Sequence, residues 1–235
     1  MILLFPNHID MIPDWFRGSD VVFEIISLFA TFFIFFTARR IYKHTNDKQF
    51  KWFYYSFFMF FLSFLSKTFS YIVIYYPVVI KTTIHNLEIV SQKILVFNAY
   101  VIGINLSMIF MLVGSFMLIK TISKSKETLP YVFYSYFIAI IVFFSNVISE
   151  NYRFVLFHIT LIFIFIIISL SYLRKYNHKK NNNLLLLFLA FLFLAVSHII
   201  LVIFFPCFGT YGLSEIIQLI GFLFIFVTYL RVNMK

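Results

Sequence analysis

The stretch LLLLFLAFLFLAVSHIILVIFF, Leu184 to Phe205, contains 22 residues, no formal charge and one histidine. An α-helix rises about 1.5 Å per residue, so 22 residues extend about 33 Å. The hydrocarbon core of a bilayer is about 30 Å thick. The stretch therefore predicts a helix that crosses a membrane.

The composition of the whole chain agrees with that prediction. Of its 235 residues, 62% are hydrophobic and only 12% are charged, and the mean hydropathy is +0.95. Soluble domains carry about 25% charged residues. We expect an all-α, polytopic protein of the cell membrane that contacts the lipid bilayer. Seven transmembrane helices are predicted, at about residues 19–41, 52–75, 94–119, 130–148, 154–173, 184–205 and 213–230.

These spans form a single transmembrane domain over residues 1–235 and leave no room for a separate soluble domain. Residues 1–18 begin with apolar side chains, but two prolines and two aspartates interrupt any long helix. This segment also lacks a basic region and a small-residue cleavage site. We interpret it as a retained interfacial segment, with Trp15 and Phe16 at headgroup depth.

The distribution of Lys and Arg predicts the orientation. The first, third and fifth loops and the C-terminal tail carry 5, 3, 4 and 2 of these residues, a total of 14 out of 19. Basic residues are concentrated on the cytoplasmic side of membrane proteins. We therefore expect the N-terminus outside and the C-terminus in the cytoplasm. The net charge of +10 is explained by this topology signal, and no nucleic-acid partner is expected.

Several polar side chains lie inside the predicted spans, all in the outer half of the membrane. They define a predicted outward-facing ligand pocket: Glu24, Lys67, Asn105, His158, His198, Glu215 and Gln218. A charge at the bilayer centre costs on the order of 2.5 to 3.5 kcal/mol, so such residues usually face the bundle interior or a water-filled cavity.

Glu24 and Lys67 are at compatible depths on consecutive antiparallel spans. We expect them to form a buried ion pair, because pairing offsets the cost of removing each charge from water. The alternative is that each side chain reaches the outer surface independently.

No catalytic, metal or cofactor site is predicted. The single cysteine, Cys207, excludes an internal disulfide and a cysteine-based zinc site. His158, His198 and Glu215 could ligate a metal or relay protons, but no pair has the spacing that places two ligands on one helical face. Hydrogen bonds to neighbouring helices are the favoured interpretation. The seventh span also lacks the lysine that retinal proteins need.

The last span, LSEIIQLIGFLFIFVTYLRV, places Glu215, Gln218 and Gly221 in an i, i+3, i+6 row, followed by Arg231. It resembles the closing helix of small seven-helix membrane modules found as uncharacterised prokaryotic proteins and as input regions of sensor kinases. The resemblance implies a ligand-sensing or interaction module, which would signal through a separate partner.

The leading interpretation is thus a receptor-like or sensor-like module, not an enzyme, with a small polar ligand from outside and a cytoplasmic or membrane protein as partner. One alternative is a small secondary transporter, which needs polar groups in the inner half as well. Another is a structural or interaction subunit of a membrane complex. A membrane enzyme that acts on lipid is the third, but no triad spacing supports it.

Overall fold

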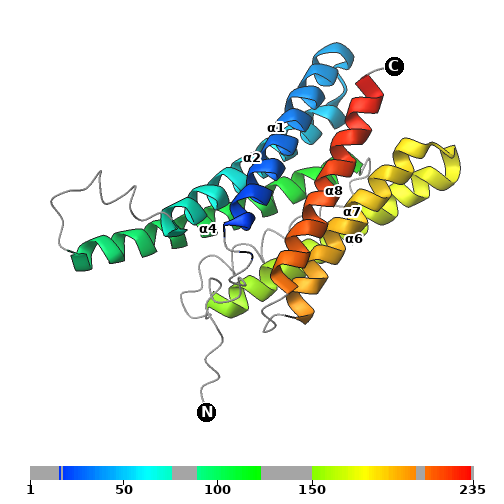
Figure 1. Cartoon of the computed structure of the whole chain (residues 1–235). Coiled ribbons are helices and arrows are strands. Elements are labelled where there is room, and N and C mark those ends of the chain that lie inside the picture. Colours follow the sequence, from blue (N-terminus) through cyan, green and yellow to red (C-terminus); the bar gives the residue numbers. More distant parts are fainter. Residues whose placement is uncertain (1–15, 17, 76–88, 123–149, 205–209, 234–235) are drawn as a thin grey trace.

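The computed structural model describes residues 16, 18–75, 89–122, 150–204 and 210–233, and all regular structure in these residues is helical (Figure 1). The helices are α1 (Ser19–Thr45), α2 (Lys48–Tyr75), α4 (Ile89–Ile122), α6 (Glu150–Lys179), α7 (Asn182–Ile203) and α8 (Thr210–Asn233). They match six of the seven predicted spans and are mostly a few residues longer. The fourth predicted span, 130–148, lies outside the described residues, as do Trp15, Cys207 and most of the N-terminal segment.

All six described helices are long and apolar enough to cross a membrane, with mean hydropathies of 1.7 to 2.9 over their most apolar stretches. Only 39 to 50% of the residues in those stretches are buried inside the protein. On α1, for example, Val22, Phe29, Phe33 and Phe36 are all exposed. Apolar side chains exposed on this scale are solvated by lipid. The chain is therefore a multi-pass membrane protein.

The described helices form a ring that follows the chain order. Each packs against the next one along the chain, and α8 packs against α1. Short links explain part of this order, because α1 and α2, and likewise α6 and α7, are separated by only two residues. Asn46 adopts a left-handed conformation (φ 53°) directly after α1. Such a residue ends a helix, and asparagine tolerates it better than most other side chains.

Interhelical contacts fix the direction of each helix. Ser56 and Ser63 of α2 bond to Gly114 and Ser107 of α4, so these two helices are antiparallel. The same kind of evidence makes α2 antiparallel to α8, α8 to α7, and α7 to α6. It follows that α4 and α6 run in the same direction.

Small residues allow α2 and α4 to approach closely. Ser56, Ser63 and Ser70 recur every seventh residue on α2 and face Gly114, Ser107 and Gly103 of α4. A Cβ atom added at Gly114 would lie 2.8 Å from the Phe60 ring and 3.0 Å from the Ser56 carbonyl oxygen. Small residues with serine hydroxyls are a common interface between membrane helices, because they permit backbone contact and interhelical hydrogen bonds.

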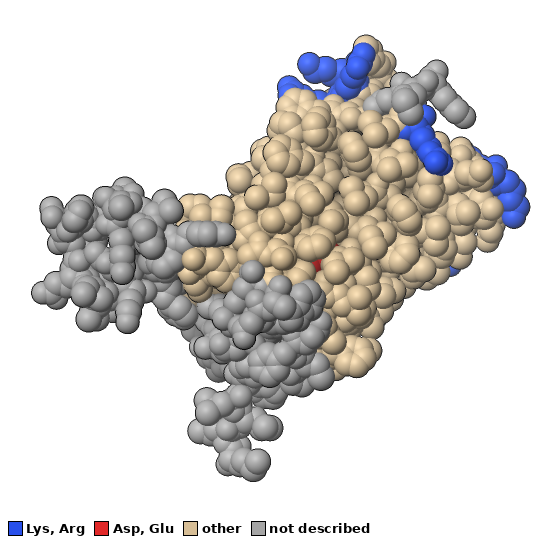
Figure 2. All heavy atoms as spheres, viewed as in Figure 1, with Lys and Arg blue, Asp and Glu red and all other residues tan. Residues whose placement is uncertain are grey.

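Basic side chains gather at one end of the ring, which we call the basic end (Figure 2). It holds the α1–α2 and α6–α7 turns and the C-terminal ends of α4 and α8. The described lysines and arginines at this end are Arg39, Arg40, Lys43, Lys48, Lys51, Lys120, Arg174, Lys175, Lys179, Lys180 and Arg231. The remaining ones in the described helices are Lys67, Lys93 and Arg153.

Candidate functional site

Lys67 of α2 is bound by two carboxylates from two other helices. Its Nζ contacts Oε1 of Glu24 on α1 and lies 2.8 Å from Oε1 of Glu215 on α8. The side chain of Lys67 is 16% exposed, and those of Glu24 and Glu215 are 1% and 6% exposed. The predicted contact between Glu24 and Lys67 is confirmed. The sequence did not indicate that Glu215 binds the same ammonium.

These three side chains, the lysine–glutamate triad, do not balance in charge when all are ionised. Two carboxylates accompany one ammonium, which leaves one formal negative charge in a buried position. Oε2 of Glu24 is buried and has no hydrogen-bond partner among the described residues. A buried charge is stable only when it is paired or hydrogen-bonded. The excess charge is removed either by a proton shared between the two carboxyl groups or by a further positive charge or hydrogen-bond donor nearby.

Tyrosines surround the triad on the side away from the basic end. The rings of Tyr71 and Tyr211 lie 5.8 and 6.0 Å from Lys67 Nζ, and their hydroxyl oxygens are 2.5 Å apart. Tyr75, stacked on Tyr71, donates a hydrogen bond of 2.6 Å to Oδ2 of Asp20. Oδ1 of Asp20 accepts from the backbone N–H groups of Gly18 and Val21 at 2.9 Å. This network links the start of α1, the end of α2 and the start of α8.

His158 of α6 and His198 of α7 form a second polar pair. Their Nδ1 atoms are 2.9 Å apart, and the two residues are 5% and 2% exposed. When both rings are neutral, the Nδ1–H of one ring donates a hydrogen bond to the unprotonated Nδ1 of the other. Nε2 of His198 is buried and has no partner among the described residues. The predicted role of these histidines in hydrogen bonding between helices is confirmed.

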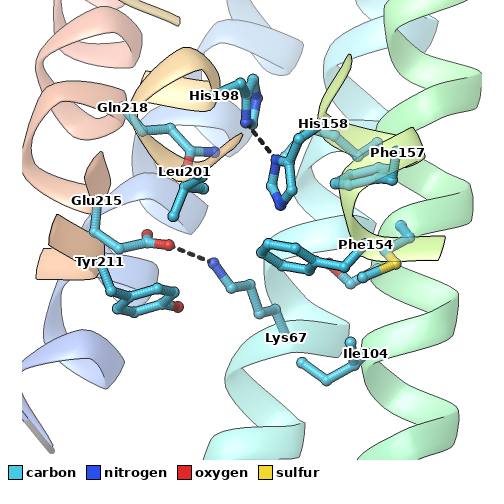
Figure 3. A pocket seen from close by; sticks show the side chains of 13 residues that line it. Lys67, Ile104, Phe154, Phe157, His158, His198, Leu201, Tyr211, Glu215 and Gln218 are labelled. Carbon is cyan, nitrogen blue, oxygen red and sulfur yellow. Dashed lines mark hydrogen bonds and ion pairs between the residues drawn. The ribbon is translucent and has the colours of Figure 1, made fainter. Parts of the chain in front are cut away.

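A cavity of about 50 Å³ lies between the triad and the histidine pair (Figure 3). Lys67, Glu215 and Gln218 line it on one side, and His158 and His198 on the other. Apolar side chains complete the wall, among them Phe154 and Leu201. A cavity of this volume accommodates a few water molecules, an ion or one small polar group. We call it the triad cavity.

The structure thus brings most of the predicted pocket residues together. Lys67, His158, His198, Glu215 and Gln218 line the triad cavity, and Glu24 joins them through Lys67. Asn105 is half-buried and does not line the cavity. Asp20, Tyr71 and Tyr211 were not predicted to belong to a site. The chain contains 15 tyrosines, so no single tyrosine stands out in the sequence.

Phe16, which we expected at headgroup depth, is enclosed by protein side chains. It is 2% exposed and packs on Phe23 and Tyr211, and a Cβ atom added at Gly212 would lie 3.1 Å from its ring. The reason is that the first turn of α8 offers an apolar surface without side-chain bulk at Gly212. Phe16 therefore covers the α8 end of the tyrosine network.

A second, larger cavity of about 490 Å³ lies at the basic end, and we call it the basic-end cavity. Gln49 at the start of α2, Tyr172 and Lys179 near the end of α6, and Tyr229 near the end of α8 contribute to its lining. Fully buried aromatic residues pack between the two cavities, including Phe57 and Phe60 of α2 and Phe222 of α8. The two cavities are thus separated by packed side chains.

Within the described residues, no three His, Cys, Asp or Glu side chains are grouped so that they could hold a metal ion. The arrangement can provide hydrogen bonds and charge, with Lys67 and Gln218 as donors and the carboxylates as acceptors. No family model matches the chain, and neither a curated protein nor a solved structure is similar to it.

Proposed function

We propose that this membrane protein is a receptor-like or sensor-like module of the cell membrane, whose triad cavity binds a small ligand that carries a positive charge or a hydroxyl group. The single observation that carries this proposal is the shared ammonium: Lys67 lies between Glu24 and Glu215, Lys67 and Glu215 border a cavity, and the two carboxylates exceed the one ammonium by one negative charge when both are ionised. A cationic or donor group in the cavity offsets that charge.

We further propose seven spans, with the N-terminus outside. Neighbouring helices in the ring are antiparallel except for the pairs α8–α1 and α4–α6. Residues 123–149 connect the end of α4 at the basic end to the start of α6 at the opposite end. The apolar run 130–148 has the composition and length of one span that runs in the required direction.

The basic end then faces the cytoplasm, because basic residues are retained on that side. The triad cavity opens toward the outside. Ligand binding changes the charge balance at Glu215, and α8 packs on both α1 and α7. A shift of α8 would alter the basic end, where a cytoplasmic or membrane protein partner would detect it.

Cysteine labelling tests the charge and the accessibility of the triad cavity together. In a Cys207→Ser background, Leu201→Cys places a thiol in the cavity wall. A small cationic methanethiosulfonate reagent, applied to the outside of intact cells, should react faster than its anionic sulfonate counterpart. The preference should disappear when Glu215→Gln is added, since this change leaves one carboxylate for one ammonium. Phe163→Cys, at a position in the middle of α6 that is 64% exposed, is the unreactive lipid-facing control.

Failure of the cationic reagent to react, or equal rates for both reagents, would contradict the proposal. Reaction only in inside-out vesicles would instead contradict the orientation and leave the cation preference intact.

A secondary transporter is the second candidate, and the basic-end cavity favours it. The sequence suggests an inner half without polar groups, but Gln49, Tyr172 and Tyr229 line a cavity there. Two cavities at opposite ends, separated by packed side chains, are what an alternating-access carrier needs. Uptake of radiolabelled methylammonium into proteoliposomes that contain the protein distinguishes the two, because a sensor binds without accumulation.

A further inference from the structure

We propose that the basic-end cavity binds a phosphate-bearing anion, the chemistry shared by the headgroup of an anionic lipid and a soluble phosphate monoester. This inference is independent of the ligand proposed for the triad cavity. It rests on unpaired hydroxyls, basic side chains and apolar walls that converge at one end of the helix ring.

Two tyrosines, Tyr172 and Tyr229, contribute hydroxyl groups to the cavity wall. Tyr172 and Tyr229 are 8% and 9% exposed, and neither hydroxyl makes a hydrogen bond to a described residue. Both hydroxyls can therefore donate hydrogen bonds to a group that binds in the cavity.

The charge of the lining favours an anion. Lys179 and Lys175 of α6 contribute to the wall, and no described acidic residue does. Lys175 also lies over the Tyr172 ring, with Nζ 5.5 Å from the ring centroid, which brings an ammonium close to one of the unpaired hydroxyls. Ammonium and hydroxyl groups are the donors that phosphate oxygens accept from. Gln49 adds an amide donor from α2.

The volume and the apolar walls exceed what a bare inorganic ion needs. Small-molecule pockets in proteins are commonly about 300 to 1,000 Å³, and this cavity of about 490 Å³ is in that range. Phe50, Phe53 and Leu184 line it beside the polar groups. Apolar surface next to phosphate-binding groups at a span end suits a glycerophosphate headgroup with the beginning of its acyl chains, because basic pockets between spans bind anionic headgroups.

The test uses the purified full chain in mixed micelles and measures its thermal midpoint. Dioleoyl phosphatidic acid should raise the midpoint in a saturable manner, and dioleoyl phosphatidylcholine at the same concentration should not. Lys179→Gln should weaken the apparent affinity about tenfold, the loss expected when one charged hydrogen bond is removed. Lys180→Gln is the matched control, because it removes the same charge one residue further on and Lys180 does not line the cavity.

The double variant Tyr172→Phe/Tyr229→Phe keeps the packing and removes only the hydroxyls. It should therefore fold normally and bind phosphatidic acid more weakly. Glycerol 3-phosphate and inorganic phosphate, added in place of the lipid, distinguish a lipid headgroup from a soluble phosphate as the bound anion. Saturable stabilisation by phosphatidic acid alone identifies a lipid headgroup, and stabilisation by glycerol 3-phosphate as well identifies a phosphate monoester site. No stabilisation by any of these probes, or equal loss with Lys179→Gln and Lys180→Gln, overturns the proposal.

Discussion

His158 and His198 approach each other across the α6–α7 interface with their Nδ1 atoms 2.9 Å apart, although 40 residues separate them in the sequence. The Phe154 and Phe157 rings pack against His158, and the Phe165 ring stacks on His198 at an interplanar angle of 10°. These aromatic rings enclose much of the histidine pair, so we expect the hydrogen bond between the two rings to stabilise the α6–α7 contact.

The histidine pair predicts a non-additive mutational cycle. His198→Phe should lower the free energy of unfolding by about 1 to 3 kcal/mol, because it leaves Nδ1 of His158 without its histidine partner in a buried position. The double variant His158→Phe/His198→Phe should recover part of that loss, since both polar partners are gone. Titration with sodium dodecyl sulfate in mixed micelles measures the three values. Additive losses would show that the two rings are not coupled.

Close packing of α2 against α4 predicts a loss of stability for Gly114→Ala. The new Cβ would lie 2.8 Å from the Phe60 ring and 3.0 Å from the Ser56 carbonyl oxygen, so the two helices must separate. Overpacking of this kind typically costs about 1 to 3 kcal/mol. Unfolding in the same titration provides the value. Ser171→Ala is the control. The exposed Ser171 hydroxyl donates only to the Ile167 backbone oxygen of its own helix, so this change should leave the free energy of unfolding nearly the same.

We expect the two termini on opposite sides of the membrane. Because α4 and α6 run in the same direction, the proposed seventh span must connect them, and an odd number of spans separates the termini. A reporter fused after residue 235 should be active only in the cytoplasm, and a tag placed before residue 1 should be accessible only from outside. Fusions in the α1–α2 and α6–α7 turns, near Asn46 and Asn181, should behave like the C-terminal one, since they lie at the same end. Termini on the same side would rule out a seventh span.

Removal of the unpaired hydroxyls at the basic end should not reduce stability. In the absence of lipid phosphate, Tyr172→Phe and Tyr229→Phe should leave the thermal midpoint unchanged or raise it slightly, because each change removes a hydroxyl that makes no hydrogen bond to the described residues. Tyr71→Phe is the contrasting variant. It breaks the hydrogen bond to the Tyr211 hydroxyl and should lower the free energy of unfolding by about 1 kcal/mol.

The sequence was sufficient for the class of protein and for one contact between consecutive spans. Glu24 and Lys67 could be paired because a short turn makes α1 and α2 antiparallel, so depth along each helix can be counted. Six spans could be placed because an unbroken apolar stretch has few alternatives in a membrane.

Contacts between distant spans could not be predicted in this way. Glu215 reaches Lys67 because α8 returns to α1 and closes the ring, and helix order around a bundle is set by side-chain packing across all the helices. A contact between the consecutive spans α2 and α4 was missed as well: the serine row of α2 has a heptad spacing that could have been noticed, but its partner Gly114 has no local signal. The basic-end cavity was missed because tyrosines at span ends are common as interfacial residues.

The stability of Lys67 variants tests the shared ammonium most directly. Lys67→Met should lower the free energy of unfolding by about 3 to 5 kcal/mol, because it leaves two buried carboxylates without a counter-charge. Adding Glu24→Gln should restore part of that loss, and adding Glu215→Gln as well should restore most of it. Unfolding by dodecyl sulfate titration of these three variants and the wild type provides the comparison. Wild-type stability for Lys67→Met, or full recovery with Glu24→Gln alone, would contradict an ammonium shared by both carboxylates.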